Sequence, residues 1–153
     1  MSYSIPTEFP TRPFQNTQTD KQAIFSAVWD YFITGQRERC MKQDGQSHWC
    51  LYRDGDHACA IGMFIPTCEE TALLLKRAND SQATVAVLFS LETGVGIPRD
   101  IAQSLTRMIC RVFDVDLQPF LADLQRQHDE GIYLPLERRL TEFAARYHLT
   151  IPS

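Results

Sequence analysis

The segment from His48 to Gly62 carries most of the side chains that could do chemistry. HWCLYRDGDHACAIG holds two histidines, two cysteines, a tyrosine and an arginine within fifteen positions. Thiols and imidazoles bind zinc or form nucleophile–base pairs, and a guanidinium suits anionic groups. These residue types leave three interpretations open: a metal site, a reactive thiol, or a hairpin with ordinary packed cysteines.

A two-residue turn at Asp54-Gly55 would fix how this segment pairs with itself. The predicted pairs are Arg53 with Asp56, Tyr52 with His57, Leu51 with Ala58, and Cys50 with Cys59. Directly opposed residues share a face, and side chains alternate along a strand. The register therefore predicts Tyr52, His57 and both cysteines on one side of the hairpin, with two sulfur atoms side by side.

The metal interpretation would use zinc and four ligands from this hairpin: His48, Cys50, His57 and Cys59. Each histidine would lie about 6 to 7 Å along the strand from the cysteine pair, which strains a tetrahedral site. The CxxC spacing typical of zinc sites is also missing from the sequence. We therefore expect no bound metal, and a structural zinc site stays an alternative.

The thiol interpretation would use Cys59 as a nucleophile in a hydrolase or transferase. His128 is the base we expect, and Gln125 stands three residues earlier on the same helical face, where it could orient the ring. Neighbouring residues on a helix point about 100° apart, so we do not expect Asp129 to do this. Because GVGIP lacks the third glycine of a dinucleotide-binding loop, no cofactor is predicted, and an enzyme is the less favoured reading.

Two short patterns resemble a family of small uncharacterised proteins found in bacteria, their phages and other mobile genetic elements. The first pattern is C-x-Y-R followed by C-A-x-G-x-x-I-P, and the second is L-Q-x-x-H-D. The matching residues are Cys50, Tyr52, Arg53, Cys59, Ala60, Gly62, Ile65, Pro66, Leu124, Gln125, His128 and Asp129. The resemblance implies that both clusters belong to one fold, and it supplies no activity. Residues 67–116 depart from the pattern.

Composition and length narrow the class of protein. The chain of 153 residues is 44% hydrophobic and 22% charged, with a net charge of -4, which predicts one ordinary domain and argues against nucleic-acid binding. The start of the chain lacks the features of a secretory signal, and the longest apolar run, residues 58–65, is too short to span a membrane. We expect a cytoplasmic protein with reduced cysteines.

Residues 1–18 predict an extended N-terminal arm, because three prolines and several aromatic residues disfavour a helix there. Such an arm would either pack on its own domain or clasp a second copy in a homodimer. Residues 19–153 would form a single domain.

The remaining pattern predicts a mostly helical α+β fold with a small antiparallel hairpin or three-stranded meander after the first helix. Helices are expected at 19–35, after Pro66, from Pro98, from Asp116 to Gly131 and at 136–147, and residues 82–92 favour a helix over a strand. The expected start signals are Thr19 with Gln22, Thr67 with Glu70, and Asp116.

The function that these features favour is a non-catalytic binding module. Its partner would be a protein or a small anionic ligand gripped by Arg53. The candidate binding residues are Cys50, Tyr52, Arg53, His57 and Asp129, around a pocket shared with the helix of His128.

Overall fold

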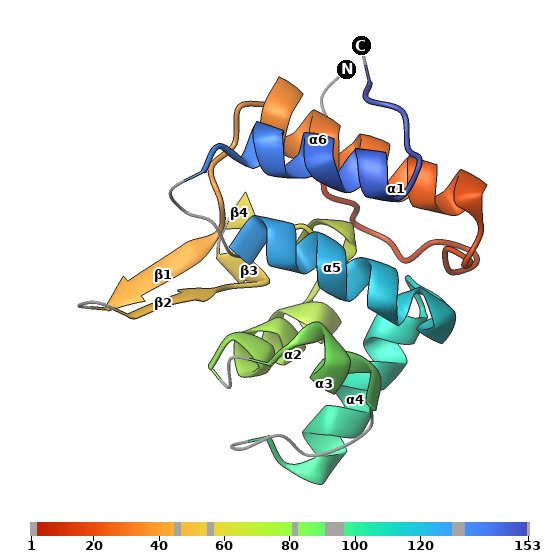
Figure 1. Ribbon diagram of the computed structural model, residues 1–153. Helices are drawn as coiled ribbons and strands as arrows, with labels where there is room; N and C mark the ends of the chain where they lie inside the picture. The colour runs from red at the N-terminus through yellow and green to blue at the C-terminus, as the bar shows by residue number, and fades with distance from the viewer. Residues whose placement is uncertain are drawn as a thin grey trace.

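The fold is mostly helical α+β, as predicted (Figure 1). The computed structural model describes residues 3–44, 47–54, 57–80, 83–90, 97–129 and 134–152, without the side chains of 41–50 and 90. The helices are α1 (Gln18–Trp29), the π-helical η1 (Asp30–Thr34), the 3-10 turn η2 (Gly62–Phe64), α2 (Glu69–Asp80), α3 (Val85–Ser90), α4 (Arg99–Cys110), the 3-10 turn η3 (Val115–Leu117), α5 (Gln118–Asp129) and α6 (Leu136–Arg146). The strands are β1 (Met41–Asp44), β2 (Ser47–Cys50), β3 (Arg53–Asp54) and β4 (His57–Ala58).

The first helix begins earlier and ends differently from the prediction. Thr17, not Thr19, is the N-cap, and its hydroxyl accepts a hydrogen bond from the Asp20 N–H. The chain then continues through η1 to Gly35, but the left-handed residue after it is Gln36, with φ of 53°. One face of this helical stretch is buried in the core and includes Ile24, Val28, Tyr31 and Phe32.

The strands form two separate two-stranded ladders rather than a three-stranded meander. In the second ladder Arg53 pairs with Ala58 and Asp54 with His57, so the predicted register around Asp54-Gly55 is wrong. Cys50 pairs with Met41 in the first ladder and therefore does not stand opposite Cys59.

The predicted start signals of two further helices are wrong by one or two residues, because neighbouring residues make the hydrogen bonds at these starts. At α2 the Cys68 N–H donates to the Thr71 hydroxyl, and Thr67 is not the cap. Ahead of α5, the carboxylate of Asp114, rather than Asp116, accepts a backbone N–H at the start of η3. Gly131, the predicted end of α5, lies outside the described residues.

The buried stripes of the later helices match the prediction. Residues 85–90 form a helix, α4 follows Pro98, and the apolar faces of α5 and α6 pack inward. Figure 1 shows α6 beside α1 and above α5, and the rings of Phe25 and Phe143 stack with centroids 6.0 Å apart. The described helices include none long and apolar enough to cross a membrane.

The N-terminal arm packs on the chain's own core. The Tyr3 hydroxyl donates to the Met63 carbonyl at 2.9 Å, and the Thr67 N–H donates to the Pro6 carbonyl at 2.9 Å. Phe14 forms a parallel bridge with Phe113. The arm thus holds the segment before α2 against the segment after α4.

Candidate functional site

Arg53 binds the loop after β4, which carries the C-A-x-G-x-x-I-P pattern. Its Nη2 donates to the carbonyls of Gly62 at 2.8 Å and Ile65 at 2.5 Å, and its Nη1 donates to the Thr67 hydroxyl at 2.7 Å. Burial lowers the pKa of the guanidinium. The guanidinium group was predicted to bind an anionic ligand. Its Nη1 and Nη2 atoms instead hold residues 62–67 in place.

Tyr52 and Gly62 meet where this loop crosses β3. A Cβ at Gly62 would lie 1.8 Å from the Tyr52 carbonyl oxygen, so only glycine fits there. The Tyr52 hydroxyl donates to the Ala83 carbonyl at 2.6 Å, and its ring is buried. Tyr52 is thus a packing residue, not part of an open binding edge.

Asn79 of α2 pairs with the backbone of β3 through its side-chain amide. Its Oδ1 accepts from the Tyr52 N–H and its Nδ2 donates to the Arg53 carbonyl, both at 2.7 Å. The side chain takes the place of a neighbouring strand for these two groups.

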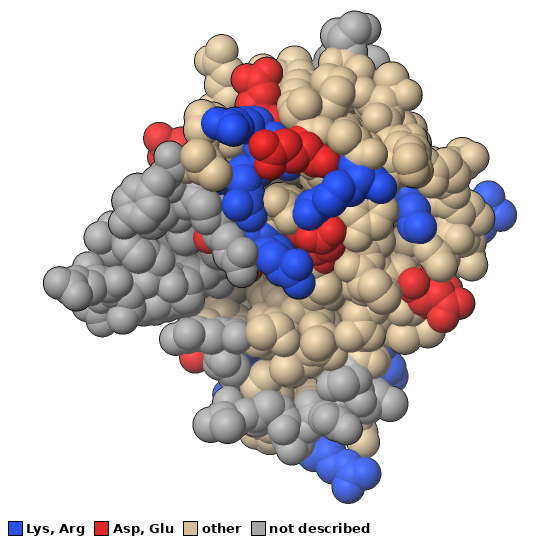
Figure 2. Space-filling model, viewed as in Figure 1, with Lys and Arg blue, Asp and Glu red and all other residues tan. Residues whose placement is uncertain are grey.

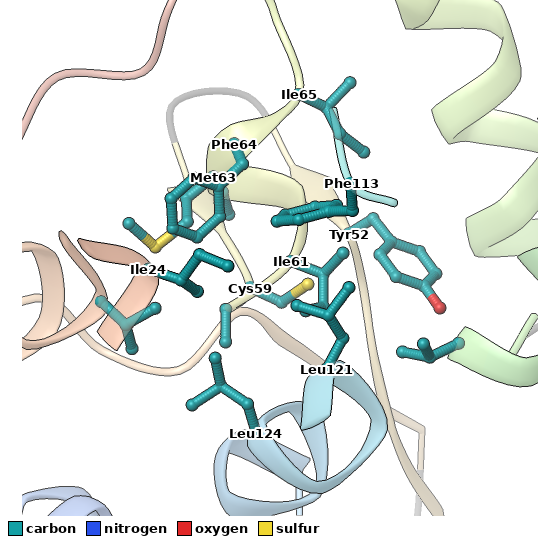
Figure 3. Packing of buried hydrophobic residues seen from close by; sticks show 14 of the residues in the cluster. Ile24, Tyr52, Cys59, Ile61, Met63, Phe64, Ile65, Phe113, Leu121 and Leu124 are labelled. Carbon is teal, nitrogen blue, oxygen red and sulfur yellow. The ribbon is translucent and has the colours of Figure 1, made fainter. Parts of the chain in front are cut away.

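Cys59 lies inside the core. Its side chain is fully buried, and Figure 3 shows the sulfur among apolar side chains that include Ile61 and Leu121. The sulfur accepts a hydrogen bond from the Gly62 N–H at 3.2 Å, and burial raises the pKa of the thiol to about 12. A neutral, enclosed thiol does not suit the role of a nucleophile.

His128 is buried and connects α5 to the segment that leads into β1. Its Nε2 lies 3.0 Å from the Cys40 nitrogen, whose N–H donates to it, so Nε2 carries no proton. Nδ1 must then hold the ring proton, which it donates to Asp129 at 2.9 Å. Both ring nitrogens are used, and His128 makes no hydrogen bond to Cys59 in the described structure.

Gln125 was expected to orient the His128 ring and Asp129 was not, but the structure shows the opposite. Asp129, not Gln125, orients the His128 ring, because a side chain at the end of α5 can turn back toward its neighbour. Gln125 instead donates from Nε2 to the same Asp129 oxygen at 2.7 Å. The prediction that Asp129 could not orient the ring was therefore wrong.

The remaining candidates do not assemble into a site with these residues. His57 is exposed on β4, while Cys59 is buried. The side chains of His48 and Cys50 lie outside the described residues, as does Asp56, the predicted partner of Arg53. Among the residues that are described, no group of three or more histidine, cysteine or acidic side chains is placed to hold a metal ion.

Sequence reasoning also missed a distinct thiol. Cys68 is partly exposed, and hydrogen bonds from the Thr71 hydroxyl and N–H lower the pKa of its thiol. The signal was present, because a cysteine followed three residues later by threonine opens α2. The other described thiols with shifted pKa values, in Cys40, Cys59 and Cys110, are shifted upward by burial.

Comparison with known proteins returns no relative: no family model, curated protein or solved structure matches the chain.

Proposed function

We propose that the protein is a cytoplasmic, non-catalytic binding module that acts through its outer surface. The observation that carries the proposal is the internal use of the motif side chains. Arg53 binds backbone carbonyls, Cys59 is enclosed, and His128 uses both ring nitrogens within the fold. The conspicuous residues of the two patterns therefore build the scaffold, and a partner must be recognised elsewhere.

The face over α5 and α6 is the surface we propose for that partner. Figure 2 shows basic and acidic side chains gathered together over these helices. Arg126 and Arg146 both approach Asp123, at 3.6 and 3.5 Å, and both arginines are about half exposed. Alternating charges suit the mixed surface of another protein better than the uniform charge of a nucleic acid.

A second copy of the chain is the first partner to test. Sedimentation velocity over a dilution series should show a dimer, and the double change Arg126→Glu with Arg146→Glu should weaken it by about tenfold or more. Lys76→Glu, on exposed α2, is the matched control and should leave association unchanged.

Thiol reactivity separates this proposal from an enzyme. With iodoacetamide near neutral pH, Cys59 should stay unmodified in the folded protein, and His128→Gln should not alter its rate. A Cys59 that reacts quickly and slows in His128→Gln would overturn the proposal, as would a monomer at every concentration that also binds no protein.

A further inference from the structure

The contact between His128 and Cys40 joins two elements that are otherwise distant in the chain. The two residues are 88 positions apart, and both are buried. Cys40 stands directly before β1, and its carbonyl accepts the Leu51 N–H at 3.0 Å, which closes the base of the β1–β2 hairpin. Figure 1 shows this hairpin projecting away from the helices. Its root is therefore fixed to α5 through one imidazole nitrogen.

From this geometry we infer that protonation of His128 releases the root of the β1–β2 hairpin from α5. We call this pH-dependent contact between His128 and Cys40 the latch. A proton from solvent that binds the Nε2 lone pair turns this acceptor into a donor, which then faces the Cys40 N–H. One N–H bond forms, between Nε2 and the proton taken from solvent, and the hydrogen bond from the Cys40 N–H to Nε2 is lost. The Nδ1–H bond to Asp129 survives, since an imidazolium still donates to a carboxylate. Acid therefore frees the hairpin root while the ring stays on α5.

The groups around the ring determine which contact breaks. Asp129, on the same helix, is about a third exposed and supplies the negative charge that holds the imidazolium. Cys40 approaches the ring from the segment before β1, and its thiol is neutral because burial raises its pKa to about 12. The Phe32 ring, centred 5.3 Å from the imidazole, covers it from η1.

More distant charges act on Cys40 rather than on the ring. Asp54 and Arg53 affect the Cys40 thiol with opposite signs. Once Nε2 is protonated, the Cys40 N–H loses its hydrogen bond to the ring. The released amide is left to water, and the hairpin root must open to reach it.

Amide hydrogen exchange followed by NMR tests the latch. Between pH about 7.5 and about 5, after correction for intrinsic exchange rates, the protection factor of the Cys40 amide should fall by about tenfold, the effect of one lost hydrogen bond. The Leu51 amide should lose protection with it. His128→Gln, whose side-chain oxygen accepts from a similar position but does not titrate, should remove the pH dependence. His57→Gln changes an exposed histidine and should behave like the unaltered protein.

Equal protection of Cys40 at both pH values would overturn the inference, as would a pH dependence that persists in His128→Gln. If that variant does not fold, nitrogen shifts of the His128 ring in the unaltered protein decide the matter. Protonation of Nε2 must coincide with the loss of Cys40 protection. A ring that gains its proton while Cys40 stays protected contradicts the latch, whatever the outcome for the binding function.

Discussion

The motif loop before α2 and the helical stripe of α5 stabilise the same core by different means. The loop, residues 59–67, is held by directed hydrogen bonds, such as those from Arg53 to its carbonyls, and by one contact that only glycine allows. The stripe on α5, which includes Leu121 and Leu124, is held by apolar burial. Burial has no preferred direction, whereas hydrogen bonds do. Small changes of shape should therefore be costly in the loop and tolerated in the stripe.

The largest effect is expected from Gly62→Ala. The added methyl group would lie 1.8 Å from the Tyr52 carbonyl oxygen, so the loop or β3 must move. We expect the free energy of unfolding to fall by more than about 3 kcal/mol, measured by urea denaturation. Leu124→Met is the control, because a volume-conserving change in the stripe should cost less than about 1.5 kcal/mol. Similar losses for both would remove the contrast between the two regions.

Arg53→Met should have the next largest effect. Methionine keeps much of the apolar stem but removes the guanidinium donor from both carbonyls, so the Gly62 carbonyl keeps only the Ile65 N–H and the Ile65 carbonyl loses the bond from Arg53. The expected loss is about 2 kcal/mol of unfolding free energy, seen in the same denaturation experiment. Arg138→Met on α6 removes only an exposed ion pair with Glu142 and should cost less than about 0.5 kcal/mol. A loss at Arg53 no greater than at Arg138 would contradict the bridging role.

Alkaline pH should weaken the loop through its enclosed thiol. Burial raises the pKa of Cys59 to about 12, whereas an unfolded cysteine ionises near about 8.5. The unfolded chain therefore loses its proton first, so the stabilisation is complete below that pH and declines as pH rises toward 12. The slope is at most about 1.4 kcal/mol per pH unit from this group. Cys59→Ala should show a gentler decline between pH about 9 and about 11, and equal slopes would refute the assignment.

The smallest effect is a gain at the end of η1. Gln36 has a left-handed backbone with φ of 53°, a conformation that favours glycine. Gln36→Gly should raise the free energy of unfolding by up to about 1 kcal/mol, measured as a shift of the urea midpoint. Gln103→Gly, in the middle of α4, should instead lower it by about 1 kcal/mol. A loss at both positions would show that Gln36 contributes side-chain contacts of its own.

The helical stripes could be predicted because periodicity is repeated over many residues. Exact cap positions could not, since Thr17 and Thr19 are equally able to cap α1 and only the fold selects one. The hairpin register failed as well, because an Asp-Gly pair predicts a turn but does not by itself fix which residues face each other across it. Each error moved an element by one or two residues and left the fold class intact.

The partners of the motif residues could not be predicted at all. Arg53 and His128 bind backbone groups, of Gly62, Ile65 and Cys40, and every residue has such groups, so the sequence holds no signal for the choice. The pattern of the two motifs did not show that the side chains of Arg53, Cys59 and His128 are directed inward.

The closure of α1 by the far end of the chain has a consequence for biosynthesis. Gln18 donates to the carbonyls of Tyr147 and His148, and the Gln22 side chain both donates to and accepts from the backbone of Thr150. Figure 1 shows the C-terminal segment, in dark blue, running beside α1 and α6. On a ribosome, α1 emerges first but lacks these partners until residues 147–150 have left the exit tunnel. These hydrogen bonds of α1 therefore form only after this stretch has been translated, so the native structure is completed at the end of synthesis of residues 147–150.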